Sequence, residues 1–319
     1  MKRVSEWMRK PMKAVMVMLV AGFVGACTDN TDTPPAKQTV TDVVLANNDF
    51  TILRDAIQYA GLADALRVGT LTVFAPNDAA FRASGFANAA AVRALPVATV
   101  KSVLQYHVLG RRIAAADILV ARNTAVATLE GPNLFVSKLT ASSGVSVNNA
   151  RVTAADVKAD NGVIHVIDRV MRPPALNLLQ VAQGNPDFTY LVAAATRAAT
   201  SNPAVLSALT STTNAFTVFA PTNQAFIAAG FPTIASINAA PAATLAAVVL
   251  NHVIADRAFS PTLATGNANA ASGGKLAVTV GTSGVTVAGK GNTQPANVVS
   301  ADILATNGVV HVVDRVLLP

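Results

Sequence analysis

Hydrophobic and polar positions follow one succession of patterns along the chain, and that succession occurs twice. In the first copy, apolar positions at helical spacing predict a helical stretch over residues 41–61. The next run, "LTVFAP", is continuously apolar, which indicates a buried strand that Pro76 ends. Asn77 or Asp78 then provides the cap of another helix, and residues 97–109 predict a further one.

Short runs of alternating apolar and polar residues come after the helices, separated by Gly, Ser and Asn. This alternation is typical of strands on a half-buried sheet. Asn161-Gly162 is a strong turn signal, and the Val/Ile alternation after it predicts a last strand. Because helices precede strands without a regular βαβ order, the fold class is α+β. The other predicted strands are residues 133–139, 144–149 and 150–157 in the first copy and 275–280 and 284–290 in the second.

The two copies share phrases as well as patterns. "LTVFAPNDAAF" recurs as "FTVFAPTNQAF", "VLQYHVLGRR" as "VVLNHVIADR", and "NGVIHVIDRVMRP" as "NGVVHVVDRVLLP". The repeat is too long for a solenoid, so it indicates two whole domains of one fold. We place them at residues 40–174 and 175–319, joined by a short linker near "PPALN".

Composition supports two folded domains and argues against nucleic acid as a partner. The 319 residues are 52% hydrophobic and 13% charged, which leaves ample material for two cores. Only 5% are aromatic, too few for a platform that stacks bases. Much of the net charge of +7 comes from the first 26 residues, so the rest of the chain shows no strongly basic surface.

The amino terminus is typical of an exported protein. Residues 1–26 combine a basic stretch with an apolar one too short to span a bilayer, which predicts a signal peptide. "VGAC" then resembles the lipobox of bacterial lipoproteins, and the resemblance implies that Cys27 is lipidated. An ordinary signal peptide or a signal anchor with an incidental cysteine is the alternative. Residues 27–39 would be a lipidated, polar tether, and Thr28 after the cysteine favours the outer membrane.

The repeated phrases resemble the signature stretches of the fasciclin domain, in order and in both copies. The resemblance implies, for each domain, a wedge-like β-sandwich with helices packed along one edge. It also implies an extracellular adhesion or binding role with no known reaction and no cofactor. Family members often carry tyrosine where the second copy has Asn251 and the first has Tyr106, so a contact of that hydroxyl is in doubt in the second domain.

Four histidines occupy equivalent places, two in each copy: His107, His165, His252 and His311. A metal site or an acid–base pair is the functional interpretation, because histidine serves in both. A buried histidine bonded to backbone is the structural interpretation, which we favour because buried polar groups need partners. No cysteine pair or His-x-His spacing supplies the remaining ligands of zinc, so we expect no metal site.

A second stretch suggests an adhesion site. Asp302 and Ile303 look like the Asp-Ile segment of animal fasciclin proteins that bind integrins, and Asp156 and Val157 are their counterparts in the first copy. A carboxylate beside an exposed aliphatic residue can dock on a metal-bearing receptor. The alternative, which we favour, is that Asp302 caps or turns the chain.

Three functions remain open from the sequence. The first, which we favour, is a lipid-anchored adhesion protein of the cell envelope that binds a cell-surface or matrix protein or a polysaccharide. The second is a module that binds a small lipid or sugar in an apolar pocket. The third is an enzyme, but no spacing singles out a catalytic pair of carboxylates. We therefore expect no catalysis, no cofactor, and contact with the membrane only through Cys27.

Overall fold

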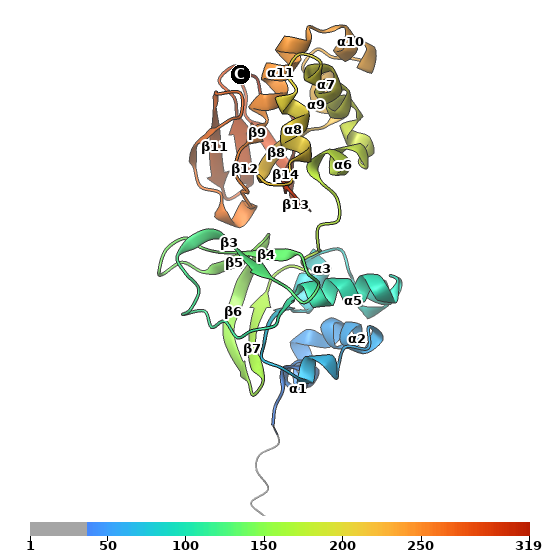
Figure 1. Ribbon diagram of the computed structural model, residues 1–319, viewed down its shortest axis with the longest axis vertical. Helices are drawn as coiled ribbons and strands as arrows, with labels where there is room; N and C mark the ends of the chain where they lie inside the picture. Colours follow the sequence, from blue (N-terminus) through green and yellow to red (C-terminus); the bar gives the residue numbers. More distant parts are fainter. Residues whose placement is uncertain (1–36) are drawn as a thin grey trace, which may run out of the picture. The chain divides into compact units, whose positions relative to one another are not determined.

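The computed structural model describes residues 37–319, in which one strand lies between the α-helices of each half of the chain and the other strands follow them (Figure 1). The predicted signal peptide and Cys27 lie outside the described residues. We call residues 40–174 domain 1 and residues 175–319 domain 2. The α+β class predicted from the patterns is confirmed in both.

Domain 1 carries its helices ahead of most of its strands. The helical segments are α1 (Val40–Ala46), η1 (Asn48–Phe50), α2 (Thr51–Tyr59), η2 (Ala65–Arg67), α3 (Asp78–Ala83), α4 (Ala89–Arg93) and α5 (Val97–Tyr106). The strands are β1 (Leu71–Pro76), β2 (Val108–Leu109), β3 (Ala121–Ala127), β4 (Asn133–Lys138), β5 (Val145–Val147), β6 (Ala150–Ala159) and β7 (Gly162–Ile167). They lie in the order β2-β1-β7-β6-β5-β4-β3, and only β1 and β7 are parallel.

Strands β1 and β7 lie between two cores of domain 1. Val73 and Ile164 face the helices and belong to the core beneath α2 and α5. Phe74 and Ile167 face the other way, into a core closed by β3, β4 and β5. Because both faces are covered, β1 is the continuous apolar run that the sequence predicted for "LTVFAP". Strand β7 also places apolar residues on both faces, with His165 among them. The result is a β-sandwich with helices on one side.

Domain 2 repeats this arrangement. Its helical segments are α6 (Leu178–Gln183), η3 (Pro186–Phe188), α7 (Thr189–Ala199), α8 (Ala204–Thr210), α9 (Asn223–Ala228), α10 (Ile234–Ala239), α11 (Ala242–Asn251) and η4 (Ser260–Thr262). Its strands are β8 (Phe216–Pro221), β9 (Val253–Ile254), β10 (Gly266–Asn269), β11 (Lys275–Gly281), β12 (Gly284–Ala288), β13 (Ala296–Ala305) and β14 (Gly308–Val313). The sheet order is β10-β11-β12-β13-β14-β8-β9, with β8 and β14 parallel. Among residues 37–319, no helix is both long and apolar enough to cross a bilayer.

The helical stretch predicted over residues 41–61 is divided into α1, η1 and α2. Asn47 breaks it: its backbone is extended, with φ −91° and ψ 127°, and its side chain accepts a hydrogen bond of 2.8 Å from the Asp49 N–H. Asparagine competes in this way with the helical backbone, so α1 ends at Ala46 and a new helical segment begins after Asn47.

The helix after β1 is capped by the first of the two residues that the sequence left open. The Asn77 side chain accepts from the Ala80 N–H at 2.8 Å, and Thr222 does the same for Ala225 in domain 2. The second residue has another task. Asp78 accepts from the Ile52 N–H at 2.9 Å and thereby ties α3 to the start of α2, as Asn223 ties α9 to α7.

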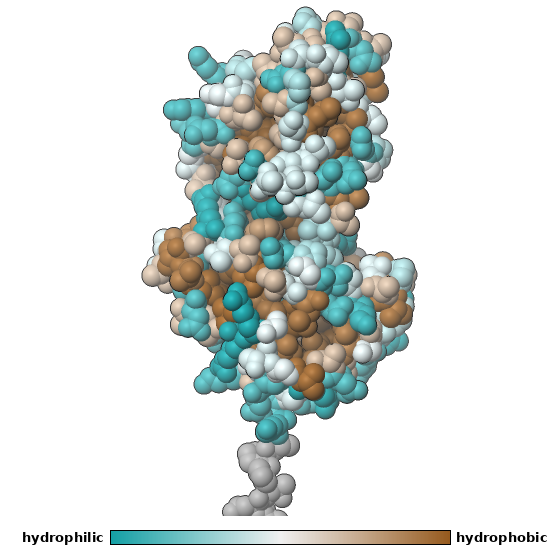
Figure 2. All heavy atoms as spheres, viewed as in Figure 1, coloured by the Kyte–Doolittle hydropathy of each residue, from teal (hydrophilic) through white to brown (hydrophobic). Residues whose placement is uncertain are grey.

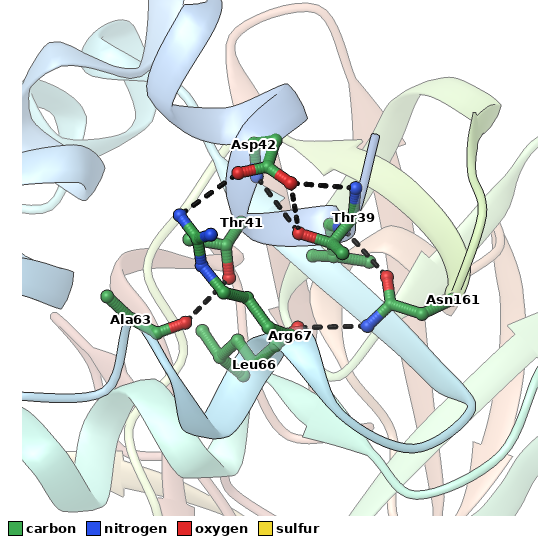
Figure 3. A network of polar contacts seen from close by, with 8 residues as sticks. Thr39, Thr41, Asp42, Ala63, Leu66, Arg67 and Asn161 are labelled. Atoms are coloured by element: carbon green, nitrogen blue, oxygen red, sulfur yellow. Dashed lines mark hydrogen bonds and ion pairs between the residues drawn. The ribbon is translucent and has the colours of Figure 1, made fainter. Parts of the chain in front are cut away.

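The Asn-Gly pair that opens the repeated phrase is not itself the hairpin turn. The turn is Asp160-Asn161, and Gly162 already pairs with Ala159 as the first residue of β7. The Asn161 side chain accepts from the Val40 N–H at 2.7 Å and donates to the Leu66 carbonyl at 3.0 Å (Figure 3). It therefore joins the amino-terminal helix to the sheet, and Asn307 does the same for Leu178 in domain 2.

Candidate functional site

The four histidines occupy two equivalent kinds of site. His107 and His252 lie at the ends of α5 and α11, where each Nδ1 faces a backbone carbonyl one turn earlier, at 2.7 and 2.8 Å. Each Nε2 accepts a backbone N–H, from Met171 at 3.0 Å and from Leu317 at 2.8 Å. Nδ1 therefore carries the proton and the ring is neutral. Burial lowers the pKa of both imidazoles to about 4.

His165 and His311 lie in the middle of β7 and β14, and in these two rings Nε2 donates and Nδ1 accepts. Nε2 faces the carbonyl of Ile113 at 2.9 Å and of Ala258 at 2.8 Å, so it carries the proton. Nδ1 accepts from the backbone N–H of Asp156 and of Asp302, both at 3.3 Å. The pKa of His311 is lowered by burial, against the opposing effect of the Asp302 carboxylate.

These contacts leave no ring nitrogen of the four histidines free for a metal or a substrate. Each ring instead connects two backbone segments that are distant in sequence. Among residues 37–319, no group of three or more His, Cys, Asp or Glu side chains is placed to hold a metal ion. The chemistry that these sites support is structural hydrogen bonding, without proton transfer to a ligand.

The proposed adhesion residues lie at irregular points in β6 and β13. Asp156 and Asp302 have positive φ values, 58° and 65°, and each lies where the pairing with the next strand shifts register. Asp156 Oδ1 accepts from the Ala115 N–H at 2.9 Å, and Asp302 Oδ1 from the Ser260 N–H at 2.7 Å. The Ser260 hydroxyl also donates to the Asp302 carboxylate. Both carboxylates therefore fasten the loop that follows β2 or β9.

Their aliphatic neighbours face inward. Val157 and Ile303 are half-buried and pack against the helical core of their own domain. A receptor would meet both the Asp302 carboxylate and the Ile303 side chain only in part in this conformation. The adhesion role of these four residues stays a prediction, and the geometry gives the two aspartates a structural task beside it.

Tyr106 and Asn251 occupy the same place in the two domains and bond differently. The buried Tyr106 hydroxyl donates to the Asn133 carbonyl and accepts from Asn148 Nδ2, both at 3.0 Å. Burial raises the pKa of this phenol to about 12. Asn251 instead donates to the Leu317 carbonyl at 3.1 Å and accepts from the Ser272 hydroxyl at 2.9 Å. The tyrosine contact is thus replaced in domain 2 by a different pair of bonds.

A cavity of about 300 Å³ opens among the helices of domain 1. Apolar side chains of α2, α3, α4 and α5 form most of its wall, and the segment after β7 closes it with Val170, Arg172 and Pro173. The Arg172 guanidinium lies 5.6 Å from the centre of the Phe86 ring. Sequence reasoning missed this cavity because it depends on side-chain volumes. The one signal that was available is Arg172, which has Leu318 as its counterpart in the otherwise matching phrase of domain 2.

Domain 1 also exposes an apolar pair just before β3. Leu119 and Val120 are 72% and 56% exposed, and their counterparts in domain 2 are Ala264 and Thr265. Figure 2 shows apolar side chains reaching the surface of the domain that contains β3–β7 in Figure 1. The pair is thus an exposed apolar feature that domain 1 has and domain 2 lacks.

Comparison with known proteins agrees with the repeated phrases. The family model described as "Fasciclin domain" matches residues 48–173 and 186–319. Transforming growth factor-beta-induced protein ig-h3 of Sus scrofa is 40% identical over 146 residues, which cover 45% of this chain and 20% of that protein. Immunogenic protein MPB70 of Mycobacterium bovis is 31% identical over 124 residues, 36% of this chain and 55% of that protein.

A solved structure also resembles this one. It is a FAS1 domain pair from the insect cell adhesion molecule fasciclin I, with 18% identity and a TM-score of 0.41, covering 88% of this chain and 96% of that chain. The present chain spans only about a fifth of the length of the porcine ig-h3 protein that it matches.

Proposed function

This chain belongs to the fasciclin domain family, and we propose that it is a non-enzymatic adhesion protein of the cell envelope, anchored by a lipid on Cys27. Its partner is a protein or polysaccharide of a cell surface or matrix. The fasciclin resemblance implies an adhesion or binding role, and no relative reported above carries the name of an enzyme.

The observation that carries the proposal is the presence of two fasciclin domains in one chain. A short linker keeps the second domain close once the first has bound, at an effective concentration of the order of mM. Weak contacts of each domain then add up to firm attachment, provided that both sites engage at once. A tandem suits adhesion better than catalysis, which needs one assembled site.

The exposed pair Leu119 and Val120 supports a protein partner for domain 1. Burying exposed aliphatic side chains on binding contributes free energy in proportion to the apolar area removed from water. The counterparts in domain 2 are Ala264 and Thr265, so the same fold accepts the smaller and more polar residues. A chain with Leu119→Ala and Val120→Thr is therefore a binding variant with little expected effect on folding.

The adhesion test uses residues 28–319 immobilised on beads, against domain 1 alone and domain 2 alone. We expect strong capture of producer cells, other cells or envelope polysaccharide by the tandem and weak capture by either half. Protease treatment of the cells before the test abolishes any capture that depends on a protein of the cell surface. We expect the Leu119→Ala, Val120→Thr chain to lose this protease-sensitive capture. If the intact tandem captures nothing, adhesion as proposed here is wrong.

Lipid anchoring is tested separately. Growth with a labelled fatty acid should label the wild-type chain and leave Cys27→Ser unlabelled, and the variant should move from the membrane fraction to the soluble one. Fractionation of inner from outer membrane then tests the proposed outer-membrane or surface location. Label that persists in Cys27→Ser would contradict anchoring at this residue.

A second candidate is the small-ligand module that the sequence left open. The cavity of about 300 Å³ in domain 1 favours it, because ligand pockets start at about this volume. Binding in that cavity does not exclude adhesion through the surface around Leu119.

A further inference from the structure

We propose that the cavity of domain 1 binds a single-chain fatty acid, with the acyl chain among the helices and the carboxylate on Arg172. The proposal does not depend on adhesion. It takes up the second candidate above and commits to the chemical class of the ligand and to the residue that recognises it.

The wall of the cavity suits an acyl chain. The side chains that form it include Phe81 from α3, Val92 from α4 and Val100 from α5, all of them buried in the core of the domain. An apolar pocket with few polar groups is the usual form of a site that holds an apolar ligand. Such a ligand gains from leaving water in proportion to the apolar area that it buries.

The polar atoms of the wall are mostly engaged. Both ring nitrogens of His107 have backbone partners, Val103 and Met171. The Ser102 hydroxyl donates to Glu130 at 2.5 Å. A ligand with many hydroxyl groups, such as a sugar, would therefore find few partners inside, and this favours a hydrocarbon chain over a carbohydrate.

Arg172 supplies the head-group contact. It is the one charged side chain in the wall, it is exposed, and among residues 37–319 it forms no ion pair and no hydrogen bond. Its guanidinium lies over Phe86, which holds it at the cavity. The planar guanidinium presents paired donors that match a carboxylate. The single charge of Arg172 matches a ligand with a single anionic group.

The size of the cavity decides between one acyl chain and two. About 300 Å³ is at the lower end of the range of ligand pockets, which extends to about 1,000 Å³. A phospholipid with two chains needs more room, whereas one chain fits the available space. A single-chain carboxylate satisfies both the volume and the charge.

Domain 2 provides an internal comparison. Leu318 stands at the position of Arg172, Ala247 at that of Ser102, and the larger Leu245 and Ile237 at those of Val100 and Val92. Domain 2 therefore has no cation at the position of Arg172, and two of the residues that correspond to the cavity wall are larger than in domain 1. We infer one site for each chain.

The experiment uses the full chain carrying Cys27→Ser, and cis-parinaric acid as a fluorescent fatty acid probe. The expected result is a saturable rise in fluorescence below the critical micelle concentration, with one probe for each chain. Palmitic acid should displace the probe, and hexadecan-1-ol, with the same chain and no charge, should displace it less well.

Three variants make the result decisive. Arg172→Leu, which copies domain 2, should weaken probe binding about tenfold or more, since a charge-assisted contact is lost. Arg169→Leu removes the same charge three residues earlier, outside the cavity wall, and should bind as the parent does. Val92→Ile with Val100→Leu narrows the cavity with residues that the same fold carries, and should also weaken binding. Thermal unfolding of each variant shows whether it folds.

The opposite results overturn the proposal. No binding by the parent chain, two probes for each chain, or equal affinity in Arg172→Leu and Arg169→Leu would each contradict it. Hexadecan-1-ol that competes as well as palmitic acid would contradict the role of Arg172, because the head group would then contribute nothing.

Discussion

The backbone N–H of Leu317 donates a hydrogen bond of 2.8 Å to Nε2 of His252, across 65 residues of sequence. Domain 1 repeats this relationship between Met171 and His107 at 3.0 Å. In each domain, the imidazole holds the segment that follows the last strand against the end of a helix. The hydrogen bond requires an unprotonated Nε2, because a protonated ring nitrogen has no lone pair with which to accept the backbone N–H.

This requirement predicts that acid destabilises both domains. The pKa of His107 and of His252 is about 4 in the folded chain and 6.5 without burial. Below pH 6.5 the unfolded chain takes up protons that the folded chain does not, so stability is complete above this pH and falls until pH 4. At pH 5 the loss is about 2 kcal/mol for each histidine. Urea unfolding at pH 7.5 and pH 5 measures it.

The variant His252→Gln separates this effect from other titrations. Glutamine keeps an acceptor for the Leu317 N–H but does not titrate. We expect a lower unfolding free energy at pH 7.5 and a smaller loss between pH 7.5 and pH 5 than in the parent chain. An unchanged pH dependence would show that His252 does not titrate as its burial implies.

A second prediction concerns the glycine that opens the last strand of each domain. A Cβ on Gly308 would lie 2.1 Å from the Phe216 carbonyl oxygen, and a Cβ on Gly162 2.1 Å from that of Leu71. Either atom would push apart a parallel strand pair at the centre of the sheet. We expect Gly308→Ala to lower the unfolding free energy by about 3 kcal/mol or more.

Gly144→Ala is the matched control, because its Cβ would meet nothing within 4 Å and its φ is not in the left-handed region. Its unfolding free energy should stay the same or rise by up to about 1 kcal/mol, since alanine restricts the unfolded chain. Equal midpoints for Gly308→Ala and Gly144→Ala in chemical unfolding would show that the Phe216 carbonyl does not lie as close to Gly308 as stated here.

Much of this architecture could be read from the sequence, because it depends on local patterns. The alternation of "GVIHVI" and the continuous run "LTVFAP" both correspond to strands, and one of the two predicted cap residues, Asn77, caps the next helix. The duplication strengthened the inference, since each pattern occurred twice. The α+β class and the individual elements followed from periodicity, caps and turns, which are properties of neighbouring residues, whereas the β-sandwich was what the fasciclin resemblance implied.

What the sequence could not supply depends on residues far apart in the chain. The positive φ of Asp156 and Asp302 arises from a register shift between two strands, and alternation predicts no such shift. The partners of the four histidines are backbone groups, which every residue offers. The cavity beside Arg172 reflects the volumes of side chains from several helices.

A third prediction tests the two roles of Asp302. Asp302→Ala removes the acceptor of Ser260 and places an alanine at φ 65°, so domain 2 should lose about 1–3 kcal/mol. Asp302→Asn tolerates the left-handed backbone and keeps one acceptor, so it should lose less. Unfolding by urea ranks the variants, and cell capture is measured on those that fold. Loss of capture by a stable Asp302→Asn chain would support the adhesion role.

The last prediction concerns the tyrosine that domain 2 lacks. Tyr106→Phe keeps the ring and removes the hydroxyl, which leaves Asn148 Nδ2 and the Asn133 carbonyl without this partner inside the domain. Unpaired buried groups of this kind cost about 1–3 kcal/mol, and we expect that loss in urea unfolding. Asn251→Ala should cost domain 2 a similar amount, because the Leu317 carbonyl and Ser272 lose their bonds. If Tyr106→Phe leaves stability unchanged, the two hydrogen bonds of the buried hydroxyl do not contribute to the stability of domain 1.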